Sequence, residues 1–222
     1  ITAFGGDVLS EDGTRAVLAE GDGATEGLAF MQSLFTDGVT PAVVATFTEE
    51  ESRLMFQQGD AVFLRNWPYV YALAAGEGSE IVGKYDVVPL PGVEEGTTTG
   101  VLGGANLAIS AYTRYPEEAW EALQCLAGEE FQKKNAIARG ELAALEALYE
   151  DPDVREAQPY LDAARSALDA AHSRPVTPYY SDVSQSIARN ANDVAAGRST
   201  PEEAIEIMQR QVQLAIEGRG EI

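Results

Sequence analysis

The residues from Phe56 to Tyr71 change their pattern several times in a short span, and this limits the folds open to the chain. Gly59 is suited to end a helix, because glycine readily adopts the left-handed conformation found just after a last helical turn. The apolar run 61–64 then predicts a short strand, and Pro68 suits the first turn of another helix. Helix, strand and helix in such close succession predict an α/β or α+β fold.

Start and stop signals for helices recur along the chain. Thr200-Pro201-Glu202-Glu203 predicts a capping box, in which the Thr200 and Glu203 side chains satisfy backbone amides at the start of a helix. Further helices are predicted within residues 13–38, 48–59, 68–75, 116–139, 141–149, 154–171 and 182–196. Pro116 is expected to begin one of them and Gly197 to end the last. Further strands are predicted at 85–91 and 101–110. The pattern is therefore rich in helices with a few short strands.

Three aromatic side chains, Trp67, Tyr69 and Tyr71, follow the strand predicted at 61–64. Aromatic faces at the edge of a sheet can stack on the C–H faces of a sugar ring while their polar tips stay hydrated. The alternative is an aromatic cluster in the core, which the local sequence alone slightly favours. Trp120 lies in an apolar helical pattern and is expected in the core.

Composition excludes several kinds of chemistry. A formal net charge of −21, with 36 acidic against 15 basic residues, disfavours binding of nucleic acid, which is itself a polyanion. Cys125, the single cysteine, cannot form an intramolecular disulfide and is expected to be a small buried side chain. With His172 as the single histidine, no metal site, cofactor site or Ser-His-Asp constellation is expected. No apolar run approaches the ~20 residues that span a bilayer.

Motifs spread over nearly the whole chain resemble, in the same order, the extracellular solute-binding proteins of ABC sugar importers. The resemblance is to the trehalose/maltose-binding branch of that family. The matching motifs are Gly5-Gly6-Asp7-Val8-Leu9-Ser10-Glu11-Asp12-Gly13, Phe56-Gln57-Gln58-Gly59, Arg65-Asn66-Trp67-Pro68-Tyr69, Val88-Pro89-Leu90-Pro91, Leu102-Gly103-Gly104, Leu107-Ala108-Ile109-Ser110, Tyr149-Glu150-Asp151-Pro152, Arg174-Pro175, Pro178-Tyr179-Tyr180, Ala196-Gly197 and Pro201-Glu202-Glu203-Ala204. Each motif alone is weak, and their order carries the resemblance.

The resemblance implies an α/β fold of the two-lobed, type II periplasmic-binding-protein kind, with the ligand held in a cleft between lobes. Residues 1–99 would form the first part of the C-terminal lobe, 100–149 a helical and strand segment of the N-terminal lobe, and 150–222 the second part of the C-terminal lobe. The chain begins Ile1-Thr2-Ala3 and reads like the middle of a protein. We therefore expect it to be the C-terminal part of a longer chain.

The resemblance also implies a set of ligand-binding residues. Carried over residue by residue, this set is Trp67, Tyr69, Gly103, Gly104, Arg174 and Tyr180. Trp67 and Tyr69 would stack on the ligand and bond to it, while Tyr71 is left to packing. Gly103 and Gly104 would bring the backbone close to sugar hydroxyls.

Several of these assignments keep an alternative. The glycine pair is equally typical of a β-bulge without a ligand. Arg174 would clamp two hydroxyls with its planar fork, or else pair with the acidic surface. Tyr179 and Tyr180 are equivalent by position, and the resemblance selects Tyr180. Ala105 stands where the family often has an aromatic residue, which leaves the preferred sugar open.

The function implied is a non-enzymatic one: capture of a di- or oligosaccharide, trehalose-like or maltose-like, and its delivery to ABC permease subunits in the membrane. The protein would be an extracellular or periplasmic monomer without cofactor or metal, with a lipid anchor as an option. One alternative is a glycoside hydrolase-like enzyme using an Asp/Glu pair. Another is a polyol- or peptide-binding protein of the same fold.

Overall fold

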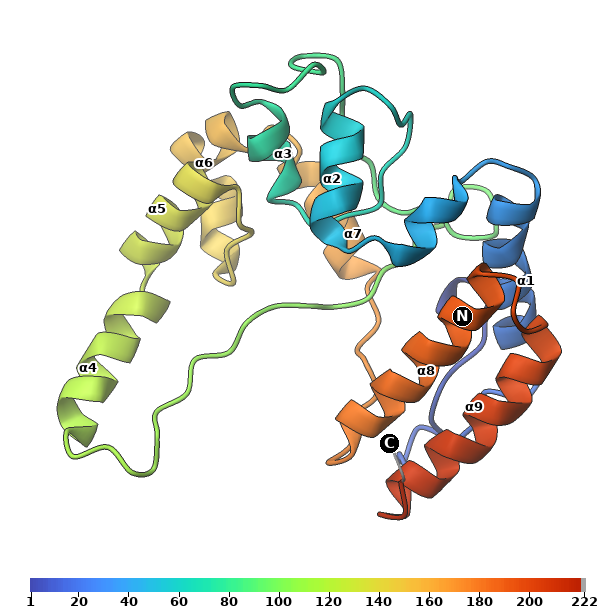
Figure 1. Cartoon of the computed structure of the whole chain (residues 1–222). Helices are drawn as coiled ribbons and strands as arrows, with labels where there is room; N and C mark the ends of the chain where they lie inside the picture. Colours follow the sequence, from blue (N-terminus) through green and yellow to red (C-terminus); the bar gives the residue numbers. More distant parts are fainter. Residues whose placement is uncertain (221–222) are drawn as a thin grey trace. The chain divides into compact units, whose positions relative to one another are not determined.

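The structure is a computed structural model that describes residues 1–220, and its regular elements are helices (Figure 1). The α-helices are α1 (Gly23–Thr36), α2 (Glu49–Gln57), α3 (Val70–Ala74), α4 (Pro116–Ala127), α5 (Glu129–Arg139), α6 (Pro152–Ala157), α7 (Leu161–Asp169), α8 (Tyr180–Ala195) and α9 (Pro201–Ile216). Short 3-10 turns are η1 (Thr2–Phe4), η2 (Ala42–Thr46) and η3 (Glu146–Glu150).

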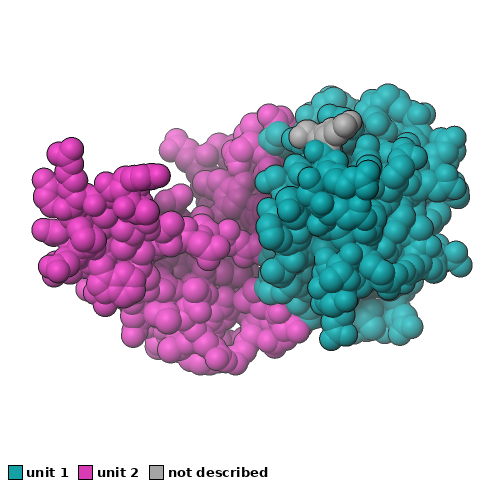
Figure 2. Space-filling model, turned by 90° about the horizontal axis from the view of Figure 1, so that it is seen from below, with its two compact units in different colours: residues 1–48, 90–102, 170–222 teal, residues 49–89, 103–169 magenta. Residues whose placement is uncertain are grey.

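The chain divides into two compact units (Figure 2). Unit 1 comprises residues 1–48, 90–102 and 170–222, and unit 2 comprises residues 49–89 and 103–169. Each unit is therefore discontinuous in sequence. The lobe assignment expected above (1–99, 100–149, 150–222) concerns a longer protein and stays a prediction.

Unit 1 is held together by α1, α8 and α9, which lie side by side (Figure 1). Met208 and Val212 of α9 and Val183 and Val194 of α8 are completely buried in a shared apolar core. The predicted capping box of α9 is confirmed: the Thr200 hydroxyl accepts from the Glu203 amide at 3.2 Å, and the Glu203 carboxylate accepts from the Thr200 amide at 3.2 Å. This cap fixes the start of α9 at Pro201.

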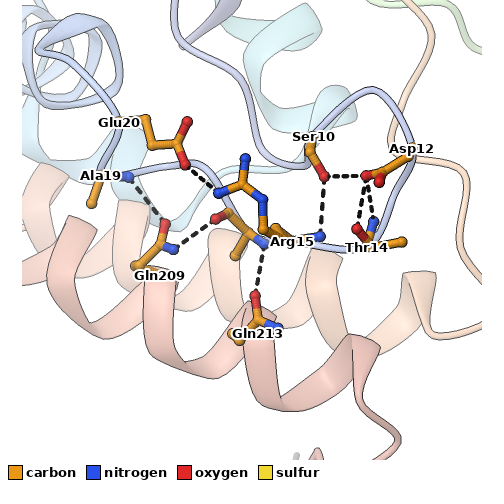
Figure 3. A network of polar contacts seen from close by, with 9 residues as sticks. Ser10, Asp12, Thr14, Arg15, Ala19, Glu20, Gln209 and Gln213 are labelled. Carbon is orange, nitrogen blue, oxygen red and sulfur yellow. Dashed lines mark hydrogen bonds and ion pairs between the residues drawn. The ribbon is translucent and has the colours of Figure 1, made fainter.

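Two glutamine side chains of α9 hold the irregular segment that precedes α1 (Figure 3). Gln209 donates to the Ala16 carbonyl at 2.7 Å and accepts from the Ala19 amide at 3.1 Å. Gln213 accepts from the Ala16 amide at 2.9 Å. The side-chain amides of α9 thus satisfy backbone groups that no strand pairs.

Before Ala16, residues 10–14 form a tight loop around Asp12 (Figure 3). The Asp12 carboxylate accepts from the hydroxyls of Ser10 and Thr14 at 2.6 and 2.8 Å and from the Thr14 amide at 3.1 Å. Hydrogen bonds from the Ser10 hydroxyl and then from Thr14 lower the pKa of Asp12 from 3.8 to about 2. The loop is therefore stabilised most when Asp12 is ionised.

Unit 2 has a smaller core, in which Ala136 of α5, Tyr149 of η3, Val154 of α6 and Leu161 of α7 pack together. Gln158, which follows α6 and is buried, donates to the carbonyls of Ala136 at 2.9 Å and Glu141 at 3.1 Å. The Gln158 side chain thus satisfies backbone carbonyls at the C-terminal end of α5 and just after it, as a helix cap does. Figure 1 shows α5 and α6 close together, and they are in contact.

The three predicted strands are the main correction. In residues 1–220 the structure has isolated bridges only: Leu9 with Ala16, Pro91 with Thr98, and Val101 with His172. Residues 61–64 make no backbone hydrogen bond, and the Phe63 side chain is 92% exposed. A strand needs a neighbour to pair with its amides and carbonyls, and the described residues supply none.

Two predicted helices were also wrong in extent. Residues 141–149 form only the 3-10 turn η3 at their end. The helix expected over 154–171 is divided into α6 and α7 at Pro159, whose ring cannot donate to the preceding turn. The predicted helices 116–139 and 182–196 correspond to α4 with α5 and to α8, and Gly59 and Gly197 have the left-handed φ values expected of helix stops.

Two side chains expected in the core lie on the surface of α4. Trp120 is 53% exposed, and Cys125 is an exposed free thiol. Ala119, Leu123 and Leu126 of α4 line a shallow hollow together with residues 107–110, so the helical pattern was right, whereas the burial expected for Trp120 and Cys125 was wrong. Across residues 1–220, no helix combines the length and the apolar character that crossing a membrane requires.

We expect Met208→Ala to destabilise unit 1 by about 2–5 kcal/mol, because it leaves a cavity in a fully buried position. Urea unfolding monitored by circular dichroism measures the change. Glu206→Ala, on the exposed side of the same helix, is the control and should stay within about 0.5 kcal/mol of the parent protein. Equal effects of the two substitutions would contradict the assignment of the α9 face.

We expect the stability difference between the parent protein and Asp12→Asn to depend on pH. The folded-state pKa of Asp12 lies below its ordinary 3.8, so its contribution is present above that value and is lost as pH falls toward 2. Urea midpoints of the two proteins should therefore converge between about pH 4 and pH 2. Glu11→Gln at the neighbouring exposed position is the control, and a constant difference for Asp12→Asn would contradict the assignment.

Candidate functional site

The loop that carries Trp67 and Tyr69 is tied to the first turn of α2 in unit 2. The Asn66 side-chain nitrogen Nδ2 donates to the Glu49 backbone carbonyl at 3.0 Å, and the Asn66 side-chain oxygen accepts from the Trp67 backbone amide at 2.7 Å. The Trp67 indole N–H approaches Glu49 Oε1 at 3.5 Å. These contacts fix the backbone of residues 66 and 67 against α2, and they therefore limit where the two aromatic side chains can lie.

Trp67 is half-buried, and Gly103 lies directly against its ring. A Cβ atom added to Gly103 would lie 2.5 Å from Trp67 Cη2 and 2.8 Å from Cζ3, closer than non-bonded carbon atoms approach in proteins. The Arg65 guanidinium lies 5.8 Å from the ring centre, within range of a cation–π contact. Gly103 and Arg65 together position the indole.

Tyr69 donates its phenolic proton to Glu50 Oε1 at 2.6 Å. Glu50 is in turn held by Arg53, whose Nε and Nη2 atoms lie 3.0 and 2.6 Å from Glu50 Oε2. Burial first, and then the hydrogen bond to Glu50, raise the pKa of Tyr69 from 10 to about 12. The phenol is therefore neutral at physiological pH and fixed in direction.

Tyr71 belongs to an aromatic cluster in the interior of unit 2. Its ring centre lies 5.1 Å from that of Tyr85 and 4.7 Å from that of Tyr160, and Phe56 completes the group. Tyr160 is buried and donates to the Gly140 carbonyl at 3.1 Å. The prediction that Tyr71 serves packing is confirmed.

Gly104 differs from Gly103, because no atom lies within 4 Å of the position of its absent Cβ. Both residues are exposed and unpaired by strands. Gly103 is required by the Trp67 ring, which neither the ligand hypothesis nor the bulge hypothesis had specified. A ligand contact by either backbone stays a prediction.

In unit 1, Arg174 and Tyr180 are brought together. Arg174 Nη1 donates to the Tyr180 hydroxyl at 3.3 Å, and Tyr180 is the first residue of α8. Among the described residues, Arg174 makes no ion pair with the acidic surface. Tyr179 instead packs its hydroxyl against Gly218. The choice of Tyr180 over Tyr179 as a ligand contact stays a prediction.

Glu49, Glu50 and Arg53 are the site neighbours that the sequence analysis missed. Glu49 and Glu50 were interpreted only as part of the start of the helix predicted within 48–59, where acidic side chains are common, and Arg53 was not singled out. The spacing of Glu50 and Arg53 at i and i+3 predicts an ion pair on one face of α2. Only the fold shows that this face meets the aromatic loop.

Each unit carries side chains of the kinds that bind polar organic molecules. Aromatic faces, a planar guanidinium and hydroxyl groups are present, and within residues 1–220 no group of three or more metal-ligating side chains is gathered. Such side chains stack on and hydrogen-bond to polar organic molecules.

Comparison with known proteins identifies the family of the chain. Residues 1–133 match the family described as bacterial extracellular solute-binding protein, and the chain belongs to that family. A probable ABC transporter-binding protein of Deinococcus radiodurans is 34% identical over 223 residues, covering 99% of this chain and 52% of the relative.

Two solved structures show the fold. The maltose-bound MalE3 of T. maritima is 34% identical with a TM-score of 0.88, covering 96% of this chain and 55% of that one. An ABC transporter solute-binding protein of Thermotoga lettingae TMO, bound with α-D-tagatose, is 24% identical with a TM-score of 0.83, covering 97% and 54%. The fold class is thus the two-lobed type II binding-protein fold, and the chain spans about half the length of the relatives it matches.

We expect Gly103→Ala to displace the Trp67 ring, because the new methyl group would overlap Cη2 and Cζ3. The near-ultraviolet circular dichroism and the fluorescence maximum of Trp67 should change while the helical signal is preserved. Asn106→Ala, exposed and nearby, is the control and should leave both unchanged. Measuring in a Trp120→Phe background isolates Trp67, and an unchanged spectrum would contradict the close packing.

Proposed function

We propose that the chain is the C-terminal part of a substrate-binding component of an ABC transporter that captures a carbohydrate without transforming it. The observation that carries the proposal is Trp67, a half-exposed indole fixed by α2, Arg65 and Gly103, on the same loop as the Tyr69 hydroxyl, which Glu50 of α2 orients. A fixed aromatic face and an oriented hydroxyl suit a sugar ring, which has an apolar face and polar edges.

The ligand class is proposed to be a di- or oligosaccharide of the maltose or trehalose kind. The T. maritima relative at 34% identity is bound to maltose, which supports this class and leaves the linkage open. Arg174 and Tyr180 of unit 1 would contribute further hydrogen bonds, since a guanidinium fork matches paired hydroxyls. The proposed set remains Trp67, Tyr69, Gly103, Gly104, Arg174 and Tyr180.

The proposal extends to location, architecture and partners. The family is extracellular, so we propose an extracellular or periplasmic monomer that delivers its ligand to membrane permease subunits. The lobe assignment, with residues 1–99 and 150–222 in one lobe and 100–149 in the other, belongs to the same proposal. A lipid anchor would hold the protein at the outer face of the membrane.

The proposal is tested with the full natural protein, by thermal unfolding in maltose, trehalose and sucrose. A ligand at 100 times its Kd should stabilise the folded state by about 2.7 kcal/mol. Trp67→Ala should remove most of this stabilisation while the ligand-free protein stays folded, because the stacking face is lost. Trp120→Ala, at an exposed tryptophan on α4, is the matched control and should keep it.

The outcomes separate the alternatives. Release of glucose from any of these sugars would overturn the binding proposal in favour of a glycoside hydrolase. Stabilisation by ribitol or a peptide but by no sugar would change the ligand class. Unchanged affinity in Trp67→Ala would show that the site lies elsewhere.

A further inference from the structure

A chain of hydrogen bonds runs from α3 through α2 to the Tyr69 hydroxyl. Gln57 Nε2 donates to the Leu73 carbonyl at 2.8 Å, and Arg53 Nη1 donates to Gln57 Oε1. Arg53 then donates through Nε and Nη2 to Glu50 Oε2 at 3.0 and 2.6 Å, and Tyr69 donates to Glu50 Oε1 at 2.6 Å. The Gln57 residue is 9% exposed and the Arg53 side chain 14%, so solvent competes little with the hydrogen bonds between these two side chains, whereas the Glu50 side chain is 54% exposed.

Only one direction of donation is possible along this chain. A carbonyl such as that of Leu73 only accepts, which turns the Gln57 amide nitrogen toward it and the Gln57 oxygen toward Arg53. A guanidinium only donates and an ionised carboxylate only accepts. The hydrogen bonds from Arg53 and Tyr69 hold the pKa of Glu50 below its ordinary value, so Glu50 is ionised at neutral pH. The Tyr69 proton must therefore point at Glu50.

We propose that Glu50 is a positioning residue that makes Tyr69 an acceptor-only group, so that the ligand group against Tyr69 is a hydrogen-bond donor. The phenolic proton is committed to Glu50, and only the oxygen lone pairs remain for a ligand. A hydroxyl or amine of the ligand satisfies them. A ligand carboxylate, phosphate or ether oxygen at this place leaves two acceptors facing each other.

The charges around Tyr69 also disfavour a ligand group that carries negative charge. Glu50 and Arg53 form an ion pair and offset each other, while Glu49 adds a negative charge that also raises the pKa of Tyr69. An anionic ligand group beside the Tyr69 oxygen is therefore repelled. This inference rests on the proposed function, since it assigns a role to the same site, and it narrows the ligand to neutral or cationic polyhydroxy compounds.

Glu50→Gln tests the proposal, because it should reverse the direction of the hydrogen bond between residue 50 and Tyr69 with little change in side-chain shape. Arg53 would take the new amide oxygen, which turns the amide nitrogen toward Tyr69 as a donor and frees the phenolic proton for the ligand. The charge that helps to raise the Tyr69 pKa is also removed, so that pKa should fall from about 12 toward 10. Glu130→Gln removes an equal charge from an exposed pair with Lys134 on α5 and is the matched control.

The first measurement is the ultraviolet titration of tyrosinate in the full natural protein and its Glu50→Gln and Glu130→Gln variants. Subtracting the curve of the same protein carrying Tyr69→Phe isolates the Tyr69 transition. A lowered transition in Glu50→Gln alone supports the proposal. An unchanged transition in Glu50→Gln, or an equal shift in Glu130→Gln, would overturn it.

The second measurement is the affinity for maltose and for its mono-O-methyl ethers, in which one hydroxyl at a time can accept but no longer donate. One ether should bind the parent protein about tenfold more weakly than maltose, since a buried acceptor is left unsatisfied. Glu50→Gln should tolerate that same ether, and Glu130→Gln should still reject it. Equal discrimination in the parent protein and Glu50→Gln would overturn the proposal.

The two proposals fail in different ways. If no carbohydrate stabilises the parent protein, the proposed function falls, and the tyrosinate titration alone decides whether Glu50 orients Tyr69. If maltose binds and Trp67→Ala abolishes binding while Glu50→Gln changes neither titration nor discrimination, the proposed function stands and the role of Glu50 falls.

Discussion

The attachment of residues 66–69 to the first turn of α2 is the constraint on which the candidate site depends. Asn66 bonds to the Glu49 carbonyl and Tyr69 bonds to the Glu50 carboxylate, at 3.0 and 2.6 Å. A loop without regular pairing would otherwise sample many conformations, and fixing each residue costs about 1–2 kcal/mol of entropy. The contacts with α2 offset part of that cost, so the aromatic rings are in place before any ligand arrives. Such preorganisation is what allows few contacts to give useful affinity.

Unit 1 uses the same kind of interaction: side chains of a helix form hydrogen bonds with the backbone of an irregular segment. Gln209 and Gln213 bond to the backbone of Ala16 and Ala19, as a neighbouring strand would. An amide side chain can donate and accept at once, which suits it to this task. Both units therefore satisfy extended backbone from a helix. That explains how they stay compact although residues 1–220 contain isolated bridges in place of a sheet.

The sequence predicted those features that depend on neighbouring residues. The Thr200–Glu203 capping box, the Gly59 and Gly197 stops and the proline start of α4 follow from local hydrogen bonding and φ preferences, and all are present. Strands at 61–64, 85–91 and 101–110 could not be predicted reliably, because apolar alternation shows what a segment favours and says nothing about its partners. Trp120 was placed in the core for the same reason: its helix face is apolar, but little covers it.

The residues of the candidate site likewise fall into those that local motifs predict and those that only tertiary contacts reveal. Trp67, Tyr69, Arg174 and Tyr180 were named from motifs, and the structure pairs Arg174 with Tyr180 and lays Gly103 against Trp67. Glu49 and Glu50 escaped notice because acidic residues in a first helical turn have a sufficient local explanation, and Arg53 because it pairs with Glu50 on the same helix.

Their contacts with Asn66, Trp67 and Tyr69 could not be predicted, because these contacts depend on the tertiary packing of α2 against the loop. Once that contact is known, the polarity of the site follows from donor and acceptor inventories alone. The Leu73 carbonyl can only accept, which orients the Gln57 amide, and the Glu50 carboxylate can only accept, which orients the Tyr69 hydroxyl. On the role proposed for Glu50, a carboxylate in the first turn of α2 would therefore determine which side of a hydrogen bond a ligand supplies.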